Sequence, residues 1–420
     1  MSAPRVMVYV QHLLGTGHLK RAVLLADAMV RRGLAVTLVS GGMPVPGLVP
    51  AAARWVQLPP VAAADLGFKA LVDAQGRAVD DTLRATRRQT LLDVWRETDP
   101  QLLLIELFPF GRRQMRFELL PLLDAARQSP HPPLIVSSVR DVLGGGQGDP
   151  QRQQRMLALF DQYFDHVLVH GDPALVPFER SFAHVPELGE RMHYTGYVVD
   201  PVPIDDDNGI GDGDGRDEVL VSAGGGAVGM PLLETAIRAR TLSQWAHCRW
   251  RVLVGAGIGA QPFSDLVALA RALHGDAMVV ERNRTDFPQL LRRCRVSISQ
   301  AGYNTVMETL QAGARSVMVP FAGGSESEQT LRAELLAQRG WIVLVREADL
   351  TPTVLAHAVD QAGARAARGA AVLGFDGADN SAEWVWQRLT PTQSCAPPTL
   401  ASTGHCGLRE DTRERPGAPA

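Results

Sequence analysis

Short apolar runs alternate with stretches of helical periodicity along most of the chain. This alternation predicts βαβ units and an α/β fold with parallel sheets. In the first half, the expected strands are residues 6–10, 35–40, 102–105, 134–138, 166–170 and 192–198. The helices expected between them are residues 18–32, 80–98, 118–128 and 150–164.

The pattern breaks once and then restarts. Residues 205–215 are acidic, rich in glycine and without apolar periodicity, which is typical of an exposed loop. A calcium-binding loop is the alternative, but no register here has the ligand spacing that such a loop needs. The strands expected after the break are residues 219–222, 250–254, 277–280, 296–298, 316–319 and 342–345, with helices that include 230–242, 329–339, 352–368 and 381–387.

The break divides the chain into two domains of similar architecture. We expect a first domain over residues 1–200, a linker over 201–217 and a second domain over 218–391. Residues 392–420 are rich in Thr, Ser, Pro, Gly and charged residues. Such a segment buries too little apolar surface to offset its ordering entropy, so we expect a disordered tail there.

Composition narrows the class of protein. The 420 residues are 45% hydrophobic and 21% charged, as in ordinary globular proteins, and the net charge of −3 argues against nucleic acid as a partner. No run approaches the length of a membrane span, and the first ten residues do not resemble a signal peptide. The four cysteines have no CxxC spacing, which fits reduced thiols in a cytoplasmic protein.

The segment from Ser299 to Glu308 carries the clearest chemical signal. It follows an expected strand, turns through Ala301 and Gly302, and opens a helix at Tyr303-Asn304-Thr305. A strand that feeds a small-residue turn and a helix N-terminus is suited to bind an anion, because free backbone N–H groups and the helix dipole point at the ligand. The carboxylate of Glu308, farther along the helix, is an acceptor suited to ribose hydroxyls. Together these features predict a nucleotide-sugar site.

A second chemical segment follows the first expected strand. Gly15-Thr16-Gly17 lets the backbone turn and approach a ligand, and His18 then begins a helix at the carboxyl edge of the sheet. The helix dipole lowers the pKa of such a histidine, so a neutral imidazole can act as a general base. A packing or capping histidine is the equally weighted alternative. Glu106 and Asp141, at the ends of two other strands, are the candidates to orient His18 or a substrate hydroxyl.

Two further segments of the second half carry polar chemistry. Gly224-Gly225-Gly226 follows an expected strand and allows close backbone approach to a phosphate, but no lysine follows as in a P-loop. Glu328 and Gln329 begin an expected helix, where they offer acceptors and an amide for sugar hydroxyls. Capping of that helix with a solvated glutamate is the alternative.

Taken together, these motifs resemble the GT-B glycosyltransferases, and most nearly family 28, the peptidoglycan N-acetylglucosaminyltransferase group. The resemblance covers roughly residues 5–390. It implies two Rossmann-like domains with parallel sheets that face a central cleft, the first for the acceptor and the second for a nucleoside diphosphate sugar. The first loop lacks the additional glycine pair of that group, and the acceptor-side residues do not match, so the acceptor is not carried over.

The resemblance also implies roles for particular residues. The turn from Ala301 to Thr305 and the triple-glycine loop would hold the diphosphate, and Glu308 the ribose. Gln329, with Glu328, would contact the sugar, and the backbone near Arg282 and Asn283 would read the base. His18 would be the base or a contact to the leaving group.

We therefore expect a bacterial-type, cytoplasmic hexosyltransferase that transfers a hexose or N-acetylhexosamine, with inversion, from a UDP-type sugar. The nucleotide sugar is the substrate, and no cofactor or metal is expected. The acceptor is an unidentified small molecule, glycan or lipid-linked molecule, which leaves room for a peripheral membrane contact. Residues 15–21 also resemble the nucleotide-sugar hydrolase of pseudaminic acid synthesis, in which the histidine would activate water. A non-catalytic nucleotide-sugar-binding protein is the third hypothesis.

Overall fold

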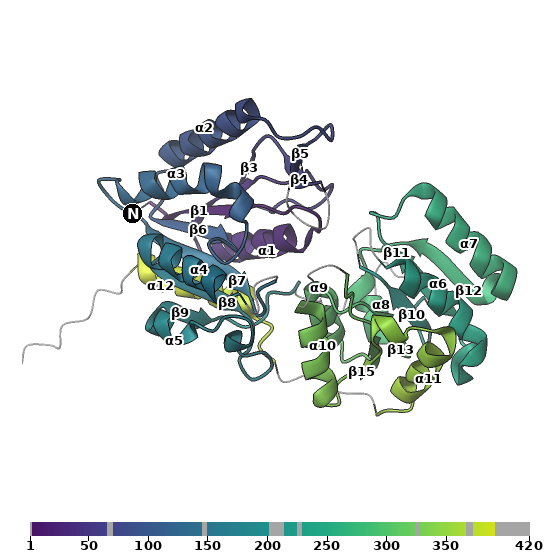
Figure 1. Ribbon diagram of the computed structural model, residues 1–420. Helices are drawn as coiled ribbons and strands as arrows, with labels where there is room; N and C mark the ends of the chain where they lie inside the picture. Colours follow the sequence, from purple (N-terminus) through teal and green to yellow (C-terminus); the bar gives the residue numbers. More distant parts are fainter. Residues whose placement is uncertain are drawn as a thin grey trace, which may run out of the picture.

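The computed structural model describes residues 2–64, 70–144, 149–200, 214–224, 229–323, 328–366 and 373–390. These residues form two lobes, each built on a parallel sheet with helices packed against it (Figure 1). The expected tail, most of the expected linker, and Gly225 and Gly226 lie outside the described residues.

The first lobe contains a seven-stranded sheet in the order β3-β2-β1-β6-β7-β8-β9, and every neighbouring pair is parallel. Its strands are β1 (Arg5–Val10), β2 (Ala35–Ser40), β3 (Arg54–Gln57), β6 (Leu102–Glu106), β7 (Leu134–Arg140), β8 (His166–His170) and β9 (Met192–Tyr194). Its helices are α1 (Gly17–Arg31), α2 (Asp81–Thr98), α3 (Arg116–Arg127), α4 (Pro150–Tyr163) and α5 (Val185–Leu188). A small antiparallel pair, β4 (Val61–Ala63) and β5 (Leu71–Asp73), lies outside this sheet.

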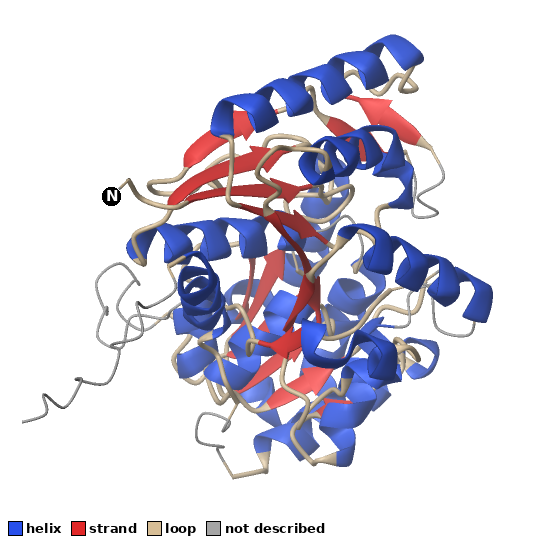
Figure 2. Cartoon of the chain, turned by 90° about the vertical axis from the view of Figure 1, so that its left-hand side faces the viewer, coloured by secondary structure: helices blue, strands red, loops and turns tan. Residues whose placement is uncertain are grey.

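The side chains of β1 show that helices cover both faces of the first sheet. Successive side chains of a strand point to opposite faces. Met7 and Tyr9 belong to the core cluster that includes side chains of α2, α3 and α4. Val6, Val8 and Val10 belong to the cluster that includes side chains of α1. Both faces are therefore buried, as is usual for parallel sheets (Figure 2).

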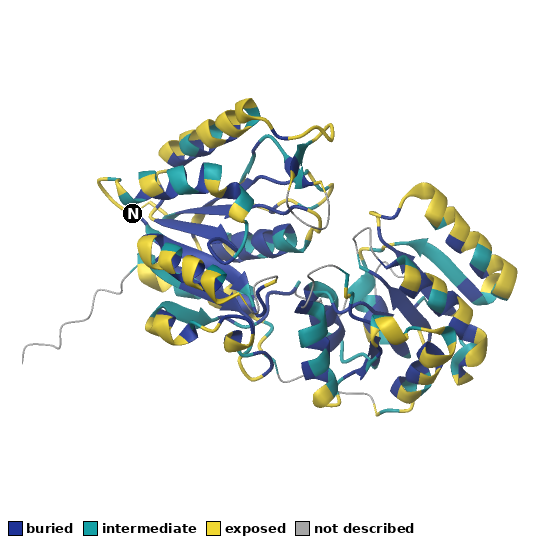
Figure 3. Cartoon of the chain, viewed as in Figure 1, coloured by how far each residue is buried: buried dark blue, intermediate teal, exposed yellow. Residues whose placement is uncertain are grey.

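The second lobe has a six-stranded parallel sheet in the order β12-β11-β10-β13-β14-β15. Its strands are β10 (Val219–Ser222), β11 (Trp250–Val254), β12 (Met278–Arg282), β13 (Val296–Ser299), β14 (Ser316–Met318) and β15 (Val343–Leu344). Its helices are α6 (Met230–Ala239), α7 (Ala260–His274), α8 (Phe287–Arg293), α9 (Tyr303–Gln311), α10 (Glu328–Gln338) and α11 (Pro352–Gly363). Strands β10, β11, β13 and β14 are buried and the edge strand β12 is half-buried, whereas the outer faces of α2 and α7 are exposed (Figure 3).

The last helix departs from the expected division of the chain. The sequence places it in the second domain, but α12 (Gly377–Leu389) packs against α1 in the first lobe (Figure 1). Ala382 and Val385 join the same buried cluster as Val6 and Val8 of β1. The first lobe is therefore completed by the C-terminal end of the described chain.

Helices α9 and α10 of the second lobe contact the first lobe. Their apolar side chains share one buried cluster with Val142, Leu175 and Tyr197 of the first lobe. This contact brings the N-terminus of α9 close to the N-terminus of α1. A Cβ atom added at Gly17 of α1 would lie 3.2 Å from the side-chain amide of Asn304, so a larger residue there would crowd α9.

Candidate active site

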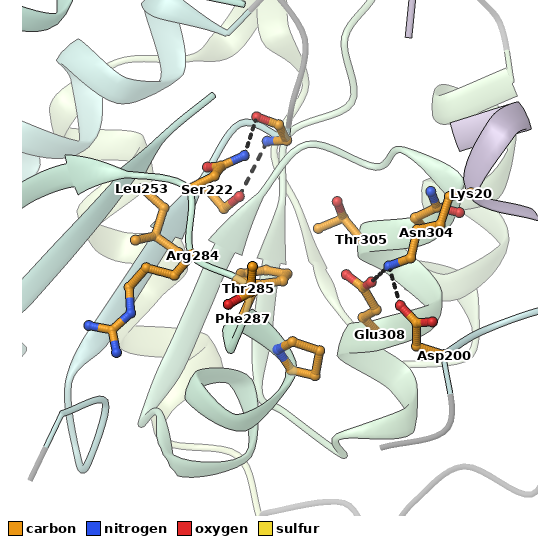
Figure 4. A pocket seen from close by; sticks show the side chains of 13 residues that line it. Lys20, Asp200, Ser222, Leu253, Arg284, Thr285, Phe287, Asn304, Thr305 and Glu308 are labelled. Atoms are coloured by element: carbon orange, nitrogen blue, oxygen red, sulfur yellow. Dashed lines mark hydrogen bonds and ion pairs between the residues drawn. The ribbon is translucent and has the colours of Figure 1, made fainter. Parts of the chain in front are cut away.

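A cavity of about 420 Å³ lies where the two lobes meet (Figure 4). Most of its wall comes from the carboxyl edge of the second sheet, where open α/β sheets bind ligands. Lys20 of α1 and Asp200 complete the wall from the first lobe. The full lining is Lys20, Asp200, Ser222, Gly224, Leu253, Asn283, Arg284, Thr285, Phe287, Pro288, Asn304, Thr305 and Glu308.

Helix α9 presents its N-terminus to this cavity. Ser299 ends β13, Gly302 is the N-cap, and Asn304 and Thr305 of the first turn line the wall. The first N–H groups of a helix have no partner within the helix, so they are available to an anion. Glu308, one turn farther on, also lines the cavity although the residue is only 7% exposed. The anion-binding turn and the carboxylate that the sequence predicts thus lie in one cavity.

The glycine loops lie on the facing edges of the two lobes. Gly224 lines the cavity, has a φ of +77° and accepts a hydrogen bond from the side-chain amide of Asn283 at 3.2 Å. A positive φ favours glycine, so the residue type is explained by the backbone. In the first lobe, Gly15 has open space around its Cα and Thr16 is the N-cap of α1.

His18 and Glu106 form a buried pair in the first lobe. The Nδ1 atom of His18 lies 2.7 Å from Oε1 of Glu106, which ends β6, and Glu106 also pairs with Arg21. A carboxylate can only accept, so this contact places the proton on Nδ1 and leaves Nε2 as the basic nitrogen. Burial, together with the charge of Arg112, lowers the pKa of His18 to about 3 and keeps the imidazole neutral. Burial opposes ionisation of Glu106, but the charge of Arg21 and the hydrogen bond from His18 hold its pKa well below the usual range.

Asp141 and Glu328 lie in a different ion-pair network. Both carboxylate oxygens of Asp141 accept from Arg332 of α10, at 2.7 Å and 3.2 Å. This geometry does not match the expectation that Asp141 orients His18. Glu328 accepts from Arg332 at 2.8 Å and lies 2.7 Å from Arg140, so its carboxylate faces two guanidinium groups. Its expected contact to the sugar stays a prediction.

Other expected donor-site residues have structural partners. The Tyr303 hydroxyl donates to the carbonyl of His170 at 3.1 Å, so this buried side chain joins the two lobes. Gln329 accepts from the backbone N–H of Phe321 at 3.1 Å. Arg282 donates to the carbonyl of Ile258 at 2.7 Å. Ala301 is fully buried, and its carbonyl accepts from Arg332.

Sequence reasoning missed Lys20, Arg21, Arg140 and Arg332. Each is a cation in or beside a helix or strand end, where a solvated side chain is the ordinary interpretation. Arg21 meets Glu106 within the first lobe, whereas each of the other three cations reaches a carboxylate across the lobe contact. Lys20 lies two residues after His18 in the sequence, but this position gives no sign of a partner in the second lobe.

Comparison with known proteins agrees with this architecture. Residues 241–371 match the glycosyltransferase family 28 C-terminal domain, a span that includes β11 and α11. Most of the second lobe is therefore similar to the C-terminal domain of family 28. This match confirms the expected resemblance to that family.

Curated relatives match only part of the chain. The UDP-N-acetylglucosamine–N-acetylmuramyl-(pentapeptide) pyrophosphoryl-undecaprenol N-acetylglucosamine transferase of Granulibacter bethesdensis is 32% identical over 176 residues, which are 39% of this chain and 44% of that protein. The enzyme of the same name from Thermotoga neapolitana is 27% identical over 196 residues, 44% of this chain and 49% of that protein. The chain thus spans about half the length of these relatives.

Solved structures share the fold along nearly the whole chain. The glycotransferase of kitacinnamycin superposes with a TM-score of 0.58 at 17% identity, covering 92% of this chain and 100% of that one. MurG of Acinetobacter baumannii gives a TM-score of 0.54 at 16% identity, with 92% and 99% covered. At this identity the likeness concerns the fold alone.

The described residues contain neither a membrane-spanning helix nor a cluster of metal ligands. Across these ranges, no helix combines the length and the apolar character needed to cross a bilayer. Within the same part of the chain, no three His, Cys, Asp or Glu side chains are grouped in a way that could hold a metal ion.

Proposed function

We propose that this protein transfers a sugar from a nucleoside diphosphate sugar, most simply a UDP-sugar, to an acceptor hydroxyl. The observation that carries the proposal is the cavity in which the N-terminus of α9 and the carboxylate of Glu308 lie together. Helix N–H groups suit a diphosphate, and a carboxylate suits the two hydroxyls of a ribose. The relatives named as UDP-N-acetylglucosamine transferases support a UDP donor.

The pair in the first lobe supplies the base in this proposal. Nε2 of His18 takes the proton of the acceptor hydroxyl as its oxygen attacks the anomeric carbon and the bond to the diphosphate breaks. Glu106 holds the imidazole by Nδ1 and stabilises the imidazolium that forms. N–H groups at the start of α9 stabilise the charge on the departing diphosphate.

We also propose that the acceptor is lipid-linked and that the protein works in the cytoplasm. A lipid-linked acceptor is supported by the names of the curated relatives, whose acceptor is an undecaprenol-linked molecule. Cys248 and Cys294 are free thiols, which suits the reducing cytoplasm.

Calorimetric titration with UDP tests the donor site. The wild type is expected to bind UDP, and Glu308→Gln to bind it at least about tenfold more weakly, because a hydrogen bond to a charged group contributes roughly 1.5–3 kcal/mol. The matched control is Glu334→Gln on α10, whose side chain pairs with Arg346 outside the cavity lining. Equal UDP affinity for Glu308→Gln and the wild type would overturn the assigned ribose contact.

Donor turnover separates transfer from its alternatives. With a panel of UDP-sugars, transfer predicts that release of UDP accelerates when a suitable acceptor is added. Free sugar released at the same rate with and without acceptors would indicate hydrolysis instead. UDP binding without turnover of any donor would indicate a binding protein.

A further inference from the structure

Lys20 of the first lobe lines the cavity and contacts Glu308 of the second lobe. It lies in the first turn of α1, whereas most of the cavity wall belongs to the second lobe. Its Nζ atom lies 2.7 Å from Oε1 of Glu308 and 2.8 Å from Oδ2 of Asp200 (Figure 4). The side chain is 27% exposed, so the ammonium group is partly withdrawn from water and held between two carboxylates.

Because carboxylates line the cavity, binding of an anion there depends on the positive charge of Lys20. The ionisable side chains of the lining are Lys20, Asp200, Arg284 and Glu308. Arg284 is already bound by Asp286 at 2.5 Å. Lys20, Asp200 and Glu308 together carry a formal charge of −1, and without Lys20 they would carry −2. A cavity with two uncompensated carboxylates would repel a diphosphate.

We propose that Lys20 is a ligand of the donor diphosphate and the residue that selects a nucleoside diphosphate over a nucleoside. This inference rests on the proposed function. In the empty cavity the ammonium group neutralises Glu308 and Asp200. When the donor enters, the ribose hydroxyls donate to Glu308 and the ammonium group turns to a phosphoryl oxygen.

The chemistry of the lysine side chain permits this exchange. An ammonium group has three N–H donors on a flexible four-carbon stem, so Lys20 can keep Asp200 while it leaves Glu308. Asn304 and Thr305, at the anion-binding start of α9, line the same cavity as Lys20. Burial opposes the charge, but Glu308 and Asp200 raise the pKa of Lys20, so it stays protonated at neutral pH. The diphosphate would then be held by both lobes at once.

The sequence offers a matched control for the test. Lys20 and Lys69 are the two lysines of the chain. Lys20→Met and Lys69→Met therefore make the same chemical change and the same change in net charge. Calorimetry is used to measure the affinity of each variant and of the wild type for uridine and for UDP.

The readout is the ratio of UDP affinity to uridine affinity. We expect Lys20→Met to lower this ratio at least tenfold, because the lost contact is to the diphosphate, and Lys69→Met to leave it unchanged. If Lys20 only covers Glu308 in the empty cavity, Lys20→Met binds both ligands more tightly and the ratio stays constant, which overturns the inference. A wild type that binds neither ligand refutes the proposed function itself.

Acetylation of the wild type gives a second measurement that needs no variant. An amine-selective reagent is added with and without saturating ligand, and peptide mass spectrometry compares modification of Lys20 with that of Lys69. We expect UDP, but not uridine, to slow acetylation of Lys20 relative to Lys69. Equal protection by both ligands, or no protection by UDP, contradicts a contact to the diphosphate.

Discussion

At the scale of single residues, substitutions in the His18–Glu106 pair are expected to affect turnover but not binding of the donor. His18→Ala is expected to abolish turnover, because the acceptor hydroxyl loses its base, while UDP affinity stays within about threefold since His18 is not part of the cavity lining. Initial-rate assays and calorimetry on the same preparation check both halves. The control is His184→Ala, at the half-exposed pair with Glu187, which is expected to leave both values unchanged. Full activity in His18→Ala would falsify the base assignment.

Glu106→Gln tests the other member of the pair. The amide can donate as well as accept, so it no longer fixes the proton on Nδ1 of His18. We expect kcat to fall by roughly 100-fold or more, with the KM for the donor little changed. A loss expressed mainly in KM would assign Glu106 to substrate binding instead.

Much of the candidate donor site could be predicted from the sequence because its signal is local. Asn304, Thr305 and Glu308 follow from one strand–turn–helix segment, and their shared cavity agrees with that prediction. Asp141 shows the limit of the strand-end rule. It lies at the predicted sheet edge, but its partner is Arg332 of the other lobe, and no local pattern encodes a contact between residues so far apart.

At the scale of elements, α12 is expected to stabilise the first lobe. Val385 is fully buried in the cluster formed by α1, α12 and one face of the first sheet. Val385→Ala removes two methyl groups from this core and is expected to lower the free energy of unfolding by about 2 kcal/mol. Gln387→Ala, at an exposed position of the same helix, is expected to change it by less than about 0.5 kcal/mol.

Urea titration followed by circular dichroism measures this difference. Hydrogen exchange of α1 amides gives an independent reading, because loosened packing of α12 exposes α1 first. Equal stability of the two variants would mean that α12 contributes little to the lobe, whatever its position.

Alternating apolar periods predict most of the elements, but they do not determine which sheet each element packs against. The strands of both sheets were largely predicted because each is a buried run with clear boundaries. The short strands β3, β4 and β5 were missed, since three or four residues give too little periodicity. The helical pattern of α12 was found, yet an apolar helix face fits either sheet, so its return to the first lobe was not predictable.

At the scale of the whole molecule, buried charges hold the lobes together. Arg332 is fully buried and bonds to Asp141 across the lobe contact, and Arg140 reaches Glu328 in the opposite direction. Removing one partner of such a pair leaves an uncompensated buried charge, which is far more costly than exposing it. The relative position of the two lobes, and with it the Lys20–Glu308 contact, therefore depends on this network.

Buried neutral histidines make the stability of the whole molecule depend on pH. Burial lowers the pKa of both His18 and His170 to about 3, whereas an unfolded histidine titrates near 6.5. The unfolded chain therefore binds more protons below about pH 6.5, so the stabilisation is complete above that pH and is lost as pH falls towards 3. Each histidine is expected to lower the free energy of unfolding by on the order of 2 kcal/mol between pH 7 and pH 5. Urea midpoints measured at half-unit steps check the slope, and a flat profile between pH 6.5 and 5 would show that these imidazoles are not held neutral in the fold.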